Sequence, residues 1–320
     1  MAACSSDPMT LCDTADAAVD PMIDGGSGSP DGAPVGALAL PSLGNNSGRS
    51  DVAFGDGSQS NLLLRRPVEL RVIDAAPGIV AGPAFISRTG ASASATTTVF
   101  VHVANHSDAR RCFVNSEGLR YFDADGQLVG HQSSMYLVGS VGRFSFQTSL
   151  QTSTCLAAGE DAYVVDFFAD VDYQAVSVVD FVLDASSLAY VEPAATVRPE
   201  QAAAIGAGLS LSVKNQGPEP VKVASFGNTW ILFDADHLPV AAGFLRPCDG
   251  GASLQLAAGA TLAMCDDSVV YRGRGQTVQS WIEFDDGSTA KASAPSAEKQ
   301  AEDAVRERLR ARLADRARRR

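Results

Sequence analysis

The sequence predicts an all-β protein in which residues 67–187 and 188–291 are two tandem β-sandwich domains. Short segments in which apolar and polar residues alternate indicate half-buried strands. Turn-forming residues recur about every 8–12 residues, and the two halves share sequence blocks in the same order. The 320 residues are enough for two domains and their extensions, and the charged fraction of 19% is low. Such a composition suits short strands and turns better than surface helices.

Residues 1–66 are predicted to be a disordered, acidic, Gly/Ser/Pro-rich tether. The first 60 residues contain eight Asp, a single Arg and one aromatic residue, Phe54. A segment of this kind cannot bury enough apolar area to offset the entropy lost on ordering. Ala2-Ala3-Cys4-Ser5-Ser6 resembles the cleavage end of a bacterial lipoprotein signal, which makes Cys4 a lipidation candidate. The signal's charged and apolar parts are missing, so this interpretation needs a start upstream of Met1; a chance cysteine is the alternative.

The internal repeat consists of three blocks. At an offset of 110, Val99, Val101, Val103 and Asn105 align with Leu209, Leu211, Val213 and Asn215. Phe122-Asp123-Ala124-Asp125 aligns with Phe233-Asp234-Ala235-Asp236, and Leu156-Ala157-Ala158-Gly159 aligns with Leu256-Ala257-Ala258-Gly259. Three blocks in one order indicate a duplicated module.

The blocks predict strands and the turns between them. Thr97–Ala104 alternates with period two, and Leu119 and Tyr121 share one face of the next strand, with Trp230 and Leu232 as counterparts. Asp123-Ala124-Asp125-Gly126 is a hairpin turn signal. Further strands are expected at Tyr163–Phe167, Val176–Leu183, Thr261–Met264 and Val278–Phe284, with opening strands near Val68–Ile73 or Leu188–Val191. About six or seven strands per copy are typical of immunoglobulin-like sandwiches.

The order of these motifs resembles the FxLYD-type modules, a family of small immunoglobulin-like domains of the bacterial cell envelope. The matching residues are Val103-Ala104-Asn105-His106-Ser107, Tyr121-Phe122-Asp123-Ala124-Asp125-Gly126 and Leu156-Ala157-Ala158-Gly159. The second copy departs from the pattern, with His237 in place of the Gly. The resemblance implies a fold and an envelope setting, with no reaction attached.

Residues 292–320 form an Arg-rich tail for which a helix is predicted. Ala297, Ala301, Val305, Leu309, Leu313 and Ala317 recur every four residues among charged residues, a stripe too thin for a core helix. Three interpretations stay open: binding to an anionic membrane surface or acidic envelope polymer, pairing with a partner helix, or a solvated tail. The candidates for anionic contact are Arg306, Arg308, Arg310, Arg312, Arg316, Arg318, Arg319 and Arg320.

Four cysteines lie in the predicted sandwiches, two in each. The expected pairs are Cys112 with Cys155 and Cys248 with Cys265, each worth roughly 3–4 kcal/mol from loop closure. Four buried free thiols are the alternative, and an envelope location favours pairing.

No catalytic, cofactor-binding or metal-binding residue is predicted. His102 and His106 share a face of a strand but would lie about 13 Å apart, and His102 is expected to be solvated. Asp123 and Asp125 open a loop that lacks the closing Glu of a calcium site, so a turn role is expected. Trp230 is expected in the core, whereas Trp281 could face either way. No motif of a hydrolase, kinase or dinucleotide-binding enzyme is present.

The net charge of −12 argues against a nucleic-acid partner, which would require a basic face. The expected function is a non-catalytic cell-envelope protein that presents two immunoglobulin-like modules for binding or scaffolding, with an unknown protein or envelope polymer as partner. An upstream signal peptide would place it in the periplasm or on the outer membrane; without one it would be cytoplasmic. The alternatives are a carbohydrate- or peptidoglycan-binding module pair and an enzyme with an unrecognised site.

Overall fold

The computed structural model describes residues 38–43, 46–52, 64–89, 96–113, 119–132, 136–138, 154–167, 169–183, 185–186, 197–205, 208–224, 228–250, 254–266 and 277–285. Within these ranges every regular element is a strand, so the all-β prediction is confirmed. No helix in these ranges is long and apolar enough to span a membrane. Cys4, the Arg-rich tail with its predicted helix and the first 37 residues of the tether lie outside the described residues.

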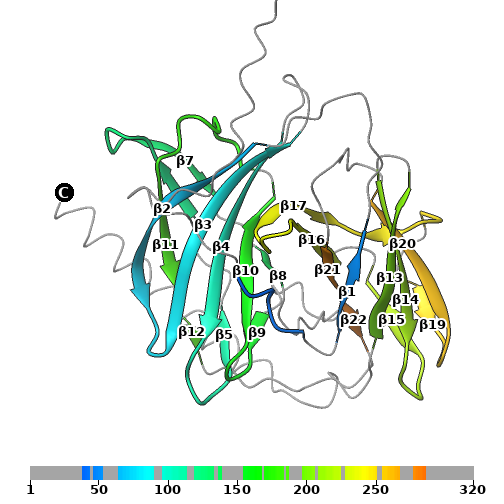
Figure 1. Ribbon diagram of the computed structural model, residues 1–320. Coiled ribbons are helices and arrows are strands. Elements are labelled where there is room, and N and C mark those ends of the chain that lie inside the picture. The colour runs from blue at the N-terminus through cyan, green and yellow to red at the C-terminus, as the bar shows by residue number, and fades with distance from the viewer. Residues whose placement is uncertain are drawn as a thin grey trace, which may run out of the picture.

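The strands surround two separate apolar cores, and each group of strands is here called a sandwich because its sheets face each other across its core. The first group is built from one large bent sheet and one small sheet (Figure 1). The large sheet has the order β7 (Leu128–Gln132), β6 (Leu119–Phe122), β11 (Val178–Leu183), β2 (Leu64–Ala75), β3 (Ile79–Thr89), β4 (Thr96–Asn105), β10 (Asp161–Asp166), β8 (Tyr136–Val138). The small sheet has the order β12 (Ala185–Ser186), β5 (Arg111–Phe113), β9 (Thr154–Leu156). Strand β2 joins the two halves of the large sheet, because its start pairs with β3 and its end pairs in parallel with β11.

Alternation with period two gives this sandwich its core. Val99, Val101 and Val103 of β4 point inward and are fully buried, opposite Leu119 and Tyr121 of β6. The Tyr121 hydroxyl donates a 2.6 Å hydrogen bond to the buried carboxylate of Asp166, so both polar groups are satisfied in the core.

The second sandwich consists of two four-stranded sheets and a small one. The first has the order β13 (Val197–Ile205), β14 (Gly208–Asn215), β20 (Thr261–Asp266), β18 (Arg246–Pro247). The second has the order β1 (Ser47–Asp51), β21 (Thr277–Trp281), β16 (Thr229–Phe233), β17 (Pro239–Phe244), and the small sheet is β19 (Leu254–Leu256), β15 (Val221–Val223), β22 (Phe284–Asp285). Trp230 is 1% exposed in this core, as predicted, and its Nε1 donates to Asp266.

Strand β1 corrects the prediction of a tether that is disordered through residue 66. It pairs antiparallel with β21, with Ser47 opposite Trp281 and Asp51 opposite Thr277. The segment therefore belongs to the second sandwich although it precedes the first in sequence. Its composition gave no sign of this, because Ser-Gly-Arg-Ser-Asp has no apolar alternation and is held by its backbone.

The repeated sequence blocks correspond to equivalent hydrogen-bonded structures. Asn105 ends β4 and its Nδ2 donates to the carbonyls of Ala109, Leu156 and Ala157. Asn215 ends β14 and donates to Glu219 and Leu256 in the same way. In return the Asn backbone carbonyl accepts from the glycine N–H of the Leu-Ala-Ala-Gly turn, which is in the left-handed region in both halves. The repeated Asn and the repeated turn are thus one unit.

The hairpin turns are also equivalent. Asp123 Oδ1 accepts from the N–H groups of residues 125 and 127, and Asp234 Oδ1 accepts from those of residues 236 and 238. Gly126 has φ of 77°, and His237 takes the same place with φ of 60°. These aspartates form turns, as the sequence indicated.

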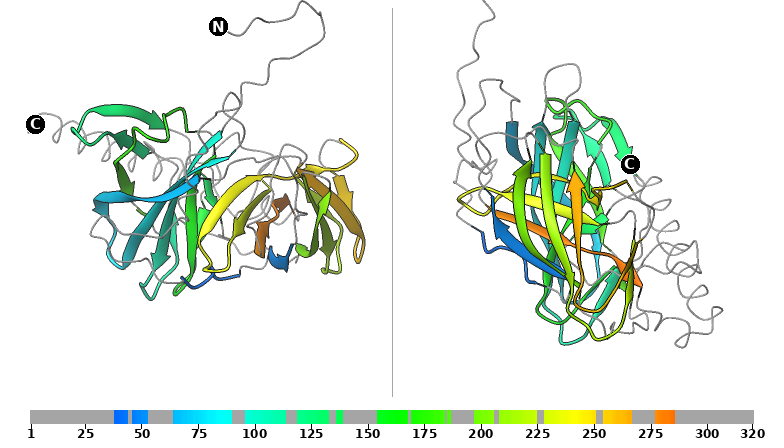
Figure 2. Two further views of the ribbon diagram at one scale, coloured as in Figure 1. Left: turned by 45° about the horizontal axis from the view of Figure 1, so that its top comes forward. Right: turned by 90° about the vertical axis from the view of Figure 1, so that its right-hand side faces the viewer.

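A third apolar cluster joins the two sandwiches. The outward faces of β3, β4 and β10 pack on the outward faces of β16, β17 and β21, so the central sheets are buried on both sides. The ring centroids of Tyr163 and Phe233 lie 5.9 Å apart, and those of Phe167 and Phe244 lie 4.3 Å apart. Figure 1 shows β10 beside β16 and β17, and the left view of Figure 2 shows the same neighbouring arrangement. The sheets therefore stack as one body. The buried members of this cluster are Phe85, Phe100, Tyr163, Val165, Phe167, Ile231, Phe233, Leu238 and Trp281.

Candidate functional site: a strap between the two sandwiches

Residues 38–43, here called the strap, lie where the two sandwiches meet. Leu38 and Leu40 pack against the inter-sandwich cluster. The Leu38 N–H donates to the carbonyl of Asp236 at 3.2 Å, and His237 Nδ1 lies 2.8 Å from the carbonyl of Leu38. His237, which has a positive φ in the turn between β16 and β17, therefore also contacts the strap.

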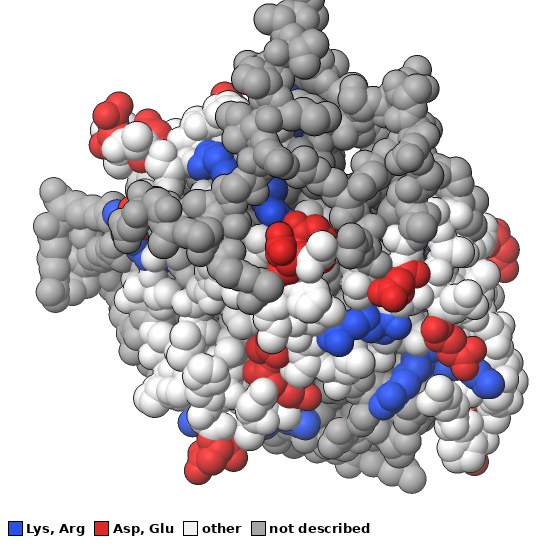
Figure 3. Space-filling view, viewed as in Figure 1, with Lys and Arg blue, Asp and Glu red and all other residues white. Residues whose placement is uncertain are grey.

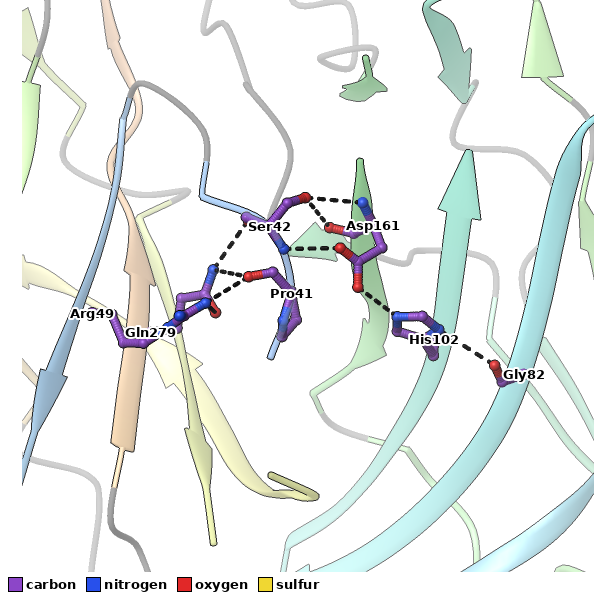
Figure 4. A network of polar contacts seen from close by, with 7 residues as sticks. All are labelled: Pro41, Ser42, Arg49, Gly82, His102, Asp161 and Gln279. Carbon is purple, nitrogen blue, oxygen red and sulfur yellow. Dashed lines mark hydrogen bonds and ion pairs between the residues drawn. The ribbon is translucent and has the colours of Figure 1, made fainter. Parts of the chain in front are cut away.

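Ser42 connects the strap to the first sandwich (Figure 4). Its N–H donates to Asp161 Oδ1 at 2.8 Å, and its hydroxyl accepts from the Asp161 N–H at 3.0 Å. The other carboxylate oxygen of Asp161 lies 2.7 Å from His102 Nε2, and His102 Nδ1 faces the carbonyl of Gly82 at 3.3 Å. Four segments of chain are thus joined through one carboxylate.

The contacts of Asp161 change its acidity. Burial alone would raise the pKa of Asp161, but the hydrogen bonds from His102 and from the Ser42 backbone lower it, and the net pKa is below its usual value. The ionised carboxylate is therefore the form that the strap contacts stabilise.

Ser42, His102 and Asp161 have the composition of a hydrolase triad but a different geometry. In a triad the hydroxyl bonds to the imidazole, which takes its proton. Here the Ser42 hydroxyl bonds to the Asp161 backbone, and both nitrogens of His102 face other acceptors, so neither is placed to act as a base for Ser42. Ser42 and Asp161 instead hold the strap against the first sandwich.

The strap also bonds to β1 and β21. The Pro41 carbonyl accepts from Arg49 Nη2 at 2.6 Å and from Gln279 Nε2 at 3.3 Å. The amide of Gln279 is fully buried, and Arg49 also donates to its Oε1. Strap, β1 and β21 are therefore one hydrogen-bonded unit (Figure 4).

A direct ion pair joins the sandwiches beside this network. Arg65 Nη1 of β2 lies 2.5 Å from Asp234 Oδ2, and both side chains are mostly buried. Asp234 thus forms its turn with one oxygen and contacts the other sandwich with the second.

The predicted solvation of His102 is wrong. Its side chain is 21% exposed and pairs with Asp161, and it shares its face of β4 with Phe100, which is buried in the inter-sandwich cluster. Trp281 is 3% exposed and lies in the inter-sandwich cluster. Within the described ranges, no three His, Cys, Asp or Glu side chains come together as a metal site requires.

One of the two expected cysteine pairs forms a disulfide in the described residues, and the other is placed by its backbone alone. Cys248 and Cys265 are joined by a disulfide, with Cα atoms 4.9 Å apart. The backbone register of β5 and β9 places Cys112 directly opposite Cys155, and that bond stays a prediction.

The sequence held one overlooked signal for this site. Trp230-Ile231-Leu232-Phe233 is a continuous apolar run, which indicates a strand buried on both faces. β1 gave no comparable signal, because Ser-Gly-Arg-Ser-Asp contains no apolar side chain, and Leu38 and Leu40 of the strap stand in a segment whose composition predicted disorder.

The described surface mixes charges of both signs. Figure 3 shows acidic and basic side chains interspersed over the described part of one face. The exposed large apolar side chains described are Leu43, Val72, Val80 and Leu128, and no aromatic ring is among them.

Comparison with known proteins gives no guide to the family. No protein-family model matches the chain, and no curated protein matches it. A solved structure of a cupin 2 conserved barrel domain protein from Leptotrichia buccalis is 11% identical, over 65% of this chain and 91% of that one, with a TM-score of 0.12. A TM-score this low carries no argument.

Proposed function

We propose that the chain is a non-catalytic cell-envelope protein whose two sandwiches form one rigid body for binding or scaffolding. The observation that carries the proposal is the apolar cluster between the sandwiches, with nine buried residues from both. Independent binding modules would join through a smaller, more polar contact and move relative to each other. A scaffold benefits from a fixed spacing and orientation.

We further propose that the sandwiches are tandem immunoglobulin-like modules. Strands β4 and β10 pair as β14 and β20 do, and β5 pairs with β9 as β15 does with β19. The shared Asn and Leu-Ala-Ala-Gly unit supports a common origin, because the same hydrogen bonds recur at equivalent places.

The disulfide supports the envelope location. Disulfides persist in oxidising compartments and are rare where thiols are kept reduced. Cys248–Cys265 is such a bond. In this proposal Cys4 carries the lipid, and residues 5–37 separate it from the strap.

The test is to isolate the natural protein from its host and fractionate the cells. We expect it in the envelope fraction, with Cys4 lipidated in the intact-mass and peptide spectra and with Cys248 and Cys265 resistant to alkylation before reduction. A cytosolic protein with an unmodified Cys4 and alkylated Cys248 and Cys265 would overturn the proposal.

The carbohydrate-binding alternative has little support from the described residues. Stacking on a sugar requires an exposed ring, and both tryptophans are at most 3% exposed. We therefore favour recognition of a protein or polymer through the outer surface of the paired body.

A further inference from the structure

The second sandwich does not supply its own edge strand beside β21. In the first sandwich β11 lies between β6 and β2, and β2 opens that sandwich in sequence. In the second, β21 lies between β16 and β1, and β1 comes from before the first sandwich. The space beside the edge of β21 and against β13, here called the β21 groove, is therefore filled by a segment that is distant in sequence.

This groove selects its occupant by specific contacts. Asn46 exchanges hydrogen bonds with Ile282: its Nδ2 donates to the Ile282 carbonyl at 2.9 Å, and its carbonyl accepts the Ile282 N–H at 3.0 Å. A Cβ at Gly48 would lie 2.3 Å from the carbonyl oxygen of Pro199, so only glycine fits there. The Ser50 hydroxyl accepts from the Ala202 N–H at 3.2 Å.

None of these contacts depends on how the segment is connected to the chain. The hydrogen bonds just described join residues 46–51 to β13 or to the β21 region, and none of them involves the first sandwich. Residues 46–51 contain no apolar side chain, and Val52, which is 5% exposed in the second core, leaves with the segment and is buried again in the exchanged form. The groove left behind would expose the backbone edge of β21, which favours the return of a strand.

We propose that the β21 groove is a strand-acceptor site whose occupant is β1 of its own chain or, by reciprocal exchange, β1 of a second copy. The exchange produces a closed dimer in which each copy completes the other's second sandwich. Both forms contain the same contacts and differ only in how residues 53–63 connect β1 to β2. Exchange of an identical element is a low-cost route to a dimer. The high effective concentration of an attached segment favours the monomer in dilute solution.

The length of residues 53–63 decides between the two forms. Strand β17 packs over β3 and β4 while β16 contacts β8, so β1 and β2 lie at opposite sides of the inter-sandwich contact (Figure 1). With strands about 4.8 Å apart and sheets about 10 Å apart, β1 and β2 are on the order of 20 Å apart. Eleven residues span this easily, whereas three residues reach only about 15 Å.

The first experiment removes residues 55–62 from the full chain. We expect a dimer of twice the monomer mass in sedimentation, with a thermal midpoint within a few degrees of that of the wild type. A matched control replaces the same residues with eight Gly and Ser and stays monomeric at low concentration. Adding Gly48→Val to the deletion abolishes the dimer, because the strand no longer fits. A folded monomer from the deletion alone contradicts the proposal.

The second experiment does not depend on the deletion variant folding. The full chain carrying Gly48→Val has an empty groove, and a synthetic peptide of residues 38–52 is added to it. We expect saturable binding and a raised thermal midpoint. The wild-type chain binds the peptide at least tenfold more weakly because its groove is filled, and a peptide carrying Gly48→Val does not bind. Absence of peptide binding to a folded Gly48→Val chain would overturn the proposal. This test is independent of the compartment and of Cys4, so its failure would leave the proposed function standing.

Discussion

At the residue scale, Asn105 and Asn215 show what kind of position the two halves have in common. Each side chain is fully buried and bridges the end of one strand to the Leu-Ala-Ala-Gly turn. A buried carbonyl that loses its donor costs about 1–3 kcal/mol. The positions kept in both halves are therefore those that satisfy backbone groups that apolar packing cannot satisfy.

We predict that Asn105→Ala lowers the free energy of unfolding by roughly 2–4 kcal/mol, because three carbonyls each lose one donor and the N–H and hydroxyl of Ser107 lose their shared acceptor. Urea unfolding measures this change. Gln255→Ala, which truncates an exposed amide on β19, serves as the control and should change stability by less than about 0.5 kcal/mol. Equal effects of the two substitutions would refute the assigned role of Asn105.

Glu283 gives the protein a pH dependence near neutrality. It lies between β21 and β22, its N–H donates to Asn228 Oδ1, and burial raises the pKa of Glu283 to about 7. A carboxyl group whose pKa is raised on folding stabilises the fold below its unfolded pKa. That contribution is lost as the pH rises through about 7.

We predict that the unfolding free energy of Glu283→Gln, relative to that of the wild type, is higher at pH 8.5 than at pH 5. The shift from 4.5 to about 7 corresponds to at most about 3 kcal/mol. Urea titrations of both proteins at the two pH values measure the difference. If the difference in unfolding free energy is the same at both pH values, the assignment of Glu283 is wrong.

At the element scale, the sequence predicted strands where apolar residues alternate and missed those held by other means. β4, β6, β10, β14, β16 and β20 all fall where the pattern indicated. β1 was missed because Ser-Gly-Arg-Ser-Asp pairs through its backbone and fits against β13 because Gly48 has no Cβ. Such recognition depends on the shape of the distant β13 and β21, which no local pattern contains.

The burial of the outward faces of the central strands was missed for a related reason. His102 occupies a polar position of an alternating strand, and alternation alone predicts solvent there. Its actual neighbours, Asp161 and Gly82, are brought to it by the register of β10 and β3. The strap contacts of Ser42 with Asp161 join residues 119 positions apart and were equally out of reach.

The disulfide Cys248–Cys265 closes a loop of 17 residues between β18 and β20. Loop-closure entropy for this length is worth about 3 kcal/mol. We predict that the double substitution Cys248→Ala, Cys265→Ala lowers the unfolding free energy by about that amount under oxidising conditions. Dithiothreitol should destabilise the wild type by about 3 kcal/mol more than the double variant, because the variant no longer contains this bond; an equal response of both proteins would contradict the prediction.

At the scale of the whole molecule, we expect the two sandwiches to unfold as one cooperative unit because the inter-sandwich cluster packs them together. Phe233 is fully buried there and packs on Tyr163 of the other sandwich. Arg65 and Asp234 add a mostly buried ion pair beside it. Loss of this contact uncouples two cores that are otherwise complete.

We predict that Phe233→Ala lowers the unfolding free energy by about 3–5 kcal/mol and splits a single thermal transition into two. Differential scanning calorimetry records both effects. Leu128→Ala removes a large apolar side chain that is 58% exposed, and it should leave one transition near the wild-type midpoint. Two transitions in the wild type itself would show that the sandwiches are independent.

The central claim is that residues 38–43 and 46–52 are part of this body and that β1 completes its second sandwich. Hydrogen–deuterium exchange of the full chain, followed by mass spectrometry, tests it most directly. We expect the peptide that covers residues 46–52 to be protected to the same degree as the peptide that covers β21, because β1 and β21 are hydrogen-bonded to each other. Complete exchange of residues 46–52 within seconds, with β21 still protected on its β16 side, would contradict the claim.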